Sequence, residues 1–81
     1  MPAKITVYSK PACPQCDQAK ALITKAGYDY EEIILDVGQQ KDPAKSYITK
    51  EELLSVIPTA RMMPQVLMDG KVINVSELYM L

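Results

Sequence analysis

The stretch KITVYSKPACPQC, residues 4–16, carries two cysteines three positions apart, just after a short run of strand-forming residues. Residues 4–8 alternate polar and β-favouring side chains, and the proline-containing segment 9–12 then interrupts that pattern. Beyond it, apolar residues recur at helical spacing up to residue 26, and Pro14 suits a first helical turn, where its missing N–H has no cost. The sequence therefore predicts a strand, a loop and a helix, with Cys13 at the start of the helix and Cys16 on its inner side.

The middle of the chain predicts a second strand and a second helix. Residues 28–37 are rich in Tyr, Ile, Leu and Val, which indicates a strand. Residues 44–48 are expected to form a short helical turn. Thr49, with Glu52 three positions later, makes a capping-box pattern ahead of an apolar run. A second helix should therefore start there and end at Pro58.

The last third of the chain predicts a hairpin and a short helix. Residues 65–68 and 71–74 flank Asp69-Gly70, a two-residue signal for a type I′ turn. A last helix of about one turn should cover residues 77–81. The order is then βαβαββα. It predicts an α/β fold with a four-stranded mixed sheet and helices on both faces.

Composition limits the functions open to this chain. Its 81 residues are enough for a single domain, residues 1–81, with a thin core. Nine Lys+Arg against ten Asp+Glu provide no basic field, so no nucleic acid partner is expected. The start lacks the apolar stretch of a signal peptide, and no apolar run approaches the roughly 18 residues that span a membrane. We expect a cytoplasmic monomer that has no membrane partner.

The two cysteines and the absence of histidine narrow the chemistry further. Without His, Ser-His and Cys-His nucleophile pairs and Cys/His zinc sites are excluded. A Cys-x-x-Cys pair between a strand and a helix is typical of a thioredoxin-like redox motif. Cys13 is expected to be the exposed attacking thiolate, stabilised by the helix N-terminus and by Lys10, and Cys16 the buried resolving thiol. Half of a metal site shared between chains and two buried filler cysteines remain as alternatives.

Pro64 stands directly ahead of the third strand. If the Met63–Pro64 bond is cis, the backbone groups of Met63 turn outward, ready to pair with an extended peptide. The alternative is a trans proline entering a strand, which is the commoner case because cis bonds make up only about 5 to 6% of X-Pro bonds. Both alternatives stay open from the residues alone.

Two segments together resemble the glutaredoxin family: VYSKPACPQC, residues 7–16, and ARMMPQV, residues 60–66. The chain is most similar to dithiol CPxC glutaredoxins, in particular the small ones of large bacteriophages, which would place it in the host cytosol. The resemblance implies a thioredoxin fold and a glutathione-dependent thiol-disulfide oxidoreductase with glutathione as co-substrate and no metal. The implied partners are glutathione and disulfide-bearing proteins, among them ribonucleotide reductase.

The resemblance also implies a glutathione site. Lys10 would contact a glutathione carboxylate, and the Met63 backbone would pair with the glutathione cysteine beside cis-Pro64. Where the family has a Gly-Gly pair and then a residue that holds the γ-glutamyl end, this chain has Asn-Val at 74–75, then Ser76 and Glu77. The full implied set is Tyr8, Lys10, Met63, Pro64, Ser76 and Glu77.

Two alternative functions accompany this interpretation. The missing Gly-Gly pair is compatible with a glutaredoxin-shaped protein that is reduced by thioredoxin reductase. A binding role is also open, in which a dimer bridges an iron-sulfur cluster through Cys13 and glutathione.

Overall fold

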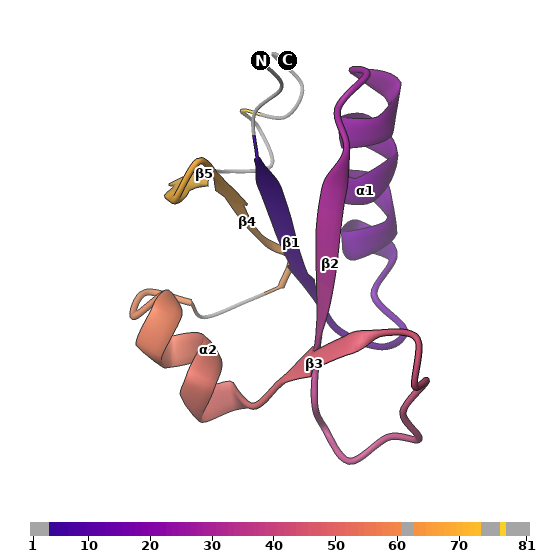
Figure 1. Cartoon of the computed structure of the whole chain (residues 1–81), viewed down its shortest axis with the longest axis vertical. Coiled ribbons are helices and arrows are strands. Elements are labelled where there is room, and N and C mark those ends of the chain that lie inside the picture. The colour runs from indigo at the N-terminus through magenta and orange to yellow at the C-terminus, as the bar shows by residue number, and fades with distance from the viewer. Residues whose placement is uncertain (1–3, 61–62, 74–76, 78–81) are drawn as a thin grey trace.

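Five strands and two helices make up the computed structural model (Figure 1), which describes residues 4–60, 63–73 and 77. The sheet has the order β3-β2-β1-β4-β5. β1 is therefore the central strand, and the loop that carries Cys13 leaves from its end. The elements are β1 (Ile5–Ser9), α1 (Pro14–Lys25), β2 (Tyr30–Leu35), β3 (Ser46–Ile48), α2 (Lys50–Val56), β4 (Gln65–Met68) and β5 (Lys71–Ile73).

The sheet is mixed, as predicted. β1 pairs with β2 in parallel across the crossover helix α1, and β2 pairs with β3 in parallel. β4 pairs antiparallel with both β1 and β5. Asp69 and Gly70, which join β4 to β5, both have positive φ values, 53° and 83°. These angles are the ones that a type I′ turn requires, and they confirm the predicted hairpin.

The helical turn expected at residues 44–48 is wrong, because Ser46–Ile48 form the strand β3 and give the sheet a fifth member. β3 lies along β2, with Tyr47 opposite Ile34 and Ile48 opposite Leu35. Three residues are too few to display a period of their own, so the free edge of β2 decides their conformation. As a result the segment between β2 and α2 is attached to the sheet next to the start of α1.

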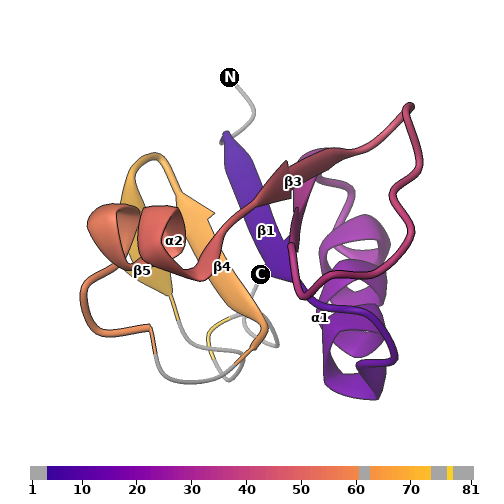
Figure 2. The same cartoon turned by 90° about the horizontal axis from the view of Figure 1, so that it is seen from below.

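The two faces of the sheet are covered by different helices, as predicted, and Figure 2 shows β1 between them. Alternate residues of β1 point to opposite faces because side chains of a strand have a period of two. On the α1 face the buried core consists of Ile5, Val7, Ala19, Ile23 and Val66. On the α2 face it consists of Tyr8, Leu53 and Ile57.

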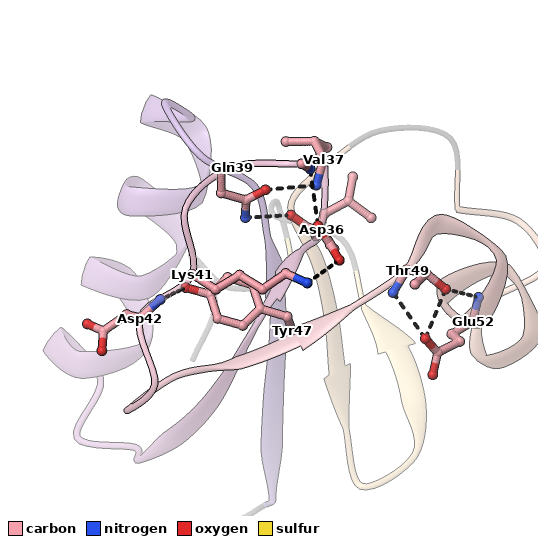
Figure 3. A network of polar contacts seen from close by, with 10 residues as sticks. Asp36, Val37, Gln39, Lys41, Asp42, Tyr47, Thr49 and Glu52 are labelled. Atoms are coloured by element: carbon pink, nitrogen blue, oxygen red, sulfur yellow. Dashed lines mark hydrogen bonds and ion pairs between the residues drawn. The ribbon is translucent and has the colours of Figure 1, made fainter.

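The start of α2 has the predicted capping box, seen at the right of Figure 3. The Thr49 hydroxyl accepts the backbone N–H of Glu52 at 3.1 Å, and a Glu52 carboxylate oxygen accepts the Thr49 N–H at 3.4 Å. Of the last predicted helix only Glu77 is described, and residues 78–81 lie outside the described residues. In the part of the chain that the structure describes, no helix has the length and apolar character to cross a membrane.

Candidate active site

Cys13 is the N-cap residue of α1. Its backbone is extended, and its Sγ accepts the backbone N–H of Cys16 at 3.2 Å. Pro14 follows at the first helical position, and Ala12 before it has a φ of 54°. That left-handed conformation is uncommon for a residue with a Cβ and costs about 1–3 kcal/mol, so the turn from β1 into α1 must be held by its surroundings. The turn places a thiol sulfur at the positive end of a helix, where negative charge is stabilised.

Both cysteines are free thiols and both are buried, Cys13 with 5% and Cys16 with 1% of its surface exposed. The expectation that Cys13 is exposed is therefore wrong. The reason is the N-cap itself, because the Cys13 sulfur turns inward to the Cys16 N–H. Cys13 nevertheless lines a surface pocket.

Cys16 lies one turn into α1, on the side that faces the core. Burial raises the pKa of its thiol to about 11, and a hydrogen bond with the Cys13 thiol acts in the same direction. A backbone hydrogen bond at Lys10 acts against this pKa increase without cancelling it. Cys16 is thus a thiol at neutral pH, and it can act as a nucleophile only after a base has taken its proton.

A network of charges lies beside the cysteine pair, between β1, β2 and α1. The Ser9 hydroxyl donates to a Glu32 carboxylate oxygen at 3.0 Å, and Lys20 Nζ lies 2.6 Å from the same oxygen. Lys20 Nζ is also 3.4 Å from Asp17. Partial burial acts to raise the pKa of Glu32, but the hydrogen bonds from Lys20 and Ser9 outweigh it and hold that pKa below its usual range. The charged forms of Lys20 and Glu32 therefore stabilise each other.

Neither Lys20 nor Glu32 was among the site residues predicted from the sequence. Glu32 stands opposite Val7 in the parallel register of β1 and β2, which turns it toward α1. Lys20 is one helical turn beyond Cys16 and reaches the same place. A charged residue within an apolar strand was the available signal, but its partner depends on a register that the residues alone do not reveal.

The residues implied for glutathione binding fall in different places. Lys10 is exposed and lines the pocket together with Cys13. Tyr8 is buried in the core on the α2 face, where Met63 packs against the same cluster. The Met63–Pro64 bond is cis, so the cis alternative is confirmed. Glu77 is exposed, and Ser76 lies outside the described residues.

The pocket beside Cys13 has a volume of about 310 Å³. One wall comes from the β1–α1 loop and the first turns of α1, and the other from the segment between β2 and the middle of β3. The second wall was not anticipated, because polar residues such as those at 38–43 are typical of a plain connector. The lining residues are Ser9, Lys10, Pro11, Ala12, Cys13, Asp17, Lys20, Glu32, Ile34, Gln39, Gln40, Lys45 and Tyr47.

Within residues 4–60, 63–73 and 77, no three His, Cys, Asp or Glu side chains are grouped so that they could hold a metal ion. The free thiols of the described residues are those of Cys13 and Cys16.

A parallel βαβ unit with a Cys-x-x-Cys pair at the helix N-terminus is typical of thiol-disulfide redox proteins of the thioredoxin fold. The family model described as glutaredoxin matches residues 5–73. The chain belongs to the glutaredoxin family, and membership implies thiol-disulfide oxidoreductase activity.

A solved structure supports the fold independently. The chain is similar to glutaredoxin 1 from Francisella tularensis, whose crystal structure is a complex with cacodylate. The two share 20% sequence identity and a TM-score of 0.66, over 94% of this chain and 87% of that one. No curated protein matches the sequence. At this identity the structural similarity establishes the thioredoxin-like fold.

Proposed function

We propose that the protein is a glutathione-dependent oxidoreductase that reduces protein disulfides and glutathione mixed disulfides. The observation that carries the proposal is the Cys13 sulfur at the N-cap of α1, 3.2 Å from the Cys16 N–H, with the buried Cys16 thiol behind it. In thiol-disulfide exchange a thiolate is the nucleophile and a second thiolate is the leaving group. Both are sulfur groups of cysteine residues or of glutathione, so the reaction does not require a histidine.

The reaction proceeds through two exchanges on the substrate. The Cys13 thiolate attacks one sulfur of the substrate disulfide, that S–S bond breaks, and the expelled thiolate takes up a proton. For a protein substrate, Cys16 then loses its proton and attacks the Cys13 sulfur of the mixed disulfide. The second substrate thiol leaves, and a Cys13–Cys16 disulfide remains.

Glutathione restores the dithiol in two steps. One glutathione thiolate attacks the Cys13 sulfur and releases Cys16 as a thiol. A second glutathione attacks the sulfur of the bound glutathione, releasing glutathione disulfide and the Cys13 thiolate. The two electrons that reduce the substrate thus come from two glutathione thiols.

The difference between the two cysteines sets this order of events. Cys13 lies at the helix N-terminus and at the edge of the pocket. Cys16 is almost fully buried, and its pKa of about 11 keeps it protonated until the mixed disulfide forms. Cys13 is therefore assigned the attacking role and Cys16 the resolving role.

Glutathione is assigned to the groups around Cys13. Lys10 is an exposed cation three positions before Cys13 and is suited to a glutathione carboxylate. The Met63 backbone, next to cis-Pro64, is assigned to the glutathione cysteine, and Tyr8 supports Met63 from the core. Ser76 and Glu77 are assigned to the γ-glutamyl end on the strength of their sequence position.

The proposal extends to the setting in which the protein works. We assign it protein disulfides as substrates, with that of ribonucleotide reductase among them, and a cytoplasmic location as a monomer of a single domain. If the chain is phage-encoded, as in the small phage glutaredoxins that it resembles, this cytoplasm is that of the host cell.

One sequence feature favours a second candidate. Asn-Val stands at positions 74–75, where glutaredoxins usually carry Gly-Gly for the close approach of glutathione. The same exchange chemistry at Cys13 and Cys16 would operate if thioredoxin reductase supplied the electrons instead.

Parallel assays decide between the two reductants. Consumption of NADPH is followed with a small mixed disulfide and with a protein disulfide, using either glutathione plus glutathione reductase or thioredoxin reductase alone. We expect turnover with glutathione and none above background with thioredoxin reductase. The reverse pattern would assign the second candidate, and no turnover in either system would contradict the proposed function.

A further inference from the structure

The pocket beside Cys13 joins the site of the chemistry to a segment from a distant part of the chain. Lys10 and Cys13 lie on one wall, and Gln40, Lys45 and Tyr47 lie on the other. Its volume of about 310 Å³ is at the lower end of the range for ligand sites, and suits one or two amino-acid side chains better than a large molecule. In Figure 1 this segment, before β3, comes close to the loop that leads from β1 into α1.

The second wall is held in place by hydrogen bonds of its own (Figure 3). Asp36 forms an ion pair with Lys41 at 2.7 Å, and the Tyr47 hydroxyl accepts the Asp42 N–H at 2.7 Å. The side-chain amide of Gln39 bonds to the backbone at both residue 35 and residue 37. Because these bonds join residues of the same segment, the wall is held by its own side chains, and a partner would lose little binding energy in ordering it.

The lining of the pocket carries a net positive charge. Lys20 is shared by Glu32 and Asp17, so its charge is compensated. The ammonium groups of Lys10 and Lys45 form neither a hydrogen bond nor an ion pair with any residue that the structure describes. The chain as a whole carries a net charge of -1, so the pocket is opposite in sign to the molecule. Lys45 acts on Glu32 from a longer distance and helps to lower the pKa of that carboxyl. The lining as a whole has three lysines, at positions 10, 20 and 45, against the carboxylates of Asp17 and Glu32. The resulting net positive charge next to the Cys13 thiol favours a carboxylate ligand.

We propose that this pocket binds an acidic side chain that neighbours the reactive cysteine in the disulfide of a protein substrate. The proposal rests on the proposed function, because it requires that Cys13 attacks that disulfide. Of the residues assigned to glutathione, Lys10 lines the pocket, whereas Met63 and Pro64 do not. Glutathione and a protein substrate therefore share Lys10, and the proposal assigns Lys45 to the acidic side chain of the protein substrate alone. Lys45 is thus the residue that distinguishes protein substrates from glutathione.

The test follows the first exchange alone, with no reductase present. Cys16→Ser protein is mixed with peptides whose single cysteine forms a disulfide with pyridine-2-thiol. The Cys13 thiolate attacks the cysteine sulfur, forms the peptide mixed disulfide and expels pyridine-2-thione, whose absorbance gives the rate. Three substrates are compared: a peptide with Asp and Glu beside the cysteine, a peptide of equal length with Lys in those places, and glutathione activated in the same way.

Lys45→Glu is expected to lower the ratio of acidic-peptide to basic-peptide rates by about tenfold at low salt, with a smaller effect at high salt. The glutathione rate should stay unchanged. Lys71→Glu is the matched control, because Lys71 is exposed on β5, outside the pocket, and its replacement makes the same change in net charge. It should leave all three rates close to those of the parent.

Two results would overturn the inference without contradicting the proposed function. One is an equal effect of Lys45→Glu and Lys71→Glu on the peptide ratio, which would reflect net charge alone. The other is a loss of the glutathione rate with Lys45→Glu as large as that of the acidic peptide, which would assign the pocket to glutathione. No exchange at Cys13 with any substrate would contradict the proposed function and the inference together.

Discussion

Cys13→Ser is expected to reduce turnover with every disulfide substrate to background, a loss on the order of 10³-fold or more, since it removes the nucleophile. Cys16→Ser is expected to keep the reduction of glutathione mixed disulfides and to lose the reduction of protein disulfides. The difference arises because a second glutathione can resolve a glutathione mixed disulfide, whereas a protein mixed disulfide depends on Cys16. The measurement is steady-state turnover of both substrates with glutathione and glutathione reductase.

Thermal unfolding of both variants controls for loss of structure. Serine is close in size to cysteine, and in Cys13→Ser the new hydroxyl can still accept the Cys16 N–H at the N-cap. Both variants should therefore remain folded. Equal loss of both activities in both folded variants would contradict the separate roles of the two cysteines.

Leu53→Ala is expected to lower the free energy of unfolding by about 2–5 kcal/mol, whereas Leu54→Ala should change it by less than about 1 kcal/mol. The two residues are neighbours on α2, and both substitutions remove the same atoms. Leu53 is 4% exposed in the core shared with Tyr8 and Ile57, whereas Leu54 is 36% exposed. Burial is therefore the main variable that separates the two changes.

Chemical denaturation at equilibrium measures both values. Tyr8 belongs to the same buried cluster as Leu53, and Met63 packs against that cluster. Leu53→Ala should therefore also slow glutathione-dependent turnover at temperatures where the protein is still folded. Equal destabilisation by the two substitutions would contradict the packing of α2 on this face of the sheet.

Local patterns were sufficient to predict much of the fold. The alternation in residues 4–8, the helical spacing after Pro14, the Thr49 capping box and the Asp69-Gly70 turn are each encoded within a few neighbouring residues. Such short-range signals depend on backbone preferences that tertiary contacts did not override here. The spacing of the cysteines likewise predicted which of them lies at the helix N-terminus and which faces the core.

What the residues alone did not reveal depends on contacts between distant parts of the chain. β3 exists because β2 offers a free edge to residues 46–48, which carry little signal of their own. The Lys20–Glu32 pair depends on the register of β2 against β1. The pocket depends on both, since one wall runs from the end of β2 to the middle of β3 and the Lys20–Glu32 pair lies in its lining. The burial of Cys13 arises from the rotation of its sulfur toward the Cys16 N–H, which spacing alone does not specify.

The most direct test of the central claim is the release of glutathione from Cys13. Reduced Cys16→Ser protein is treated with glutathione disulfide, the adduct is identified by intact mass, and the rate at which reduced glutathione removes it is measured in folded and in urea-unfolded protein. The proposed function predicts one glutathione per chain and a release rate well above that of the unfolded adduct, because the fold binds and orients the attacking glutathione. Equal rates in the folded and unfolded protein, or a folded protein that forms no adduct, would contradict it.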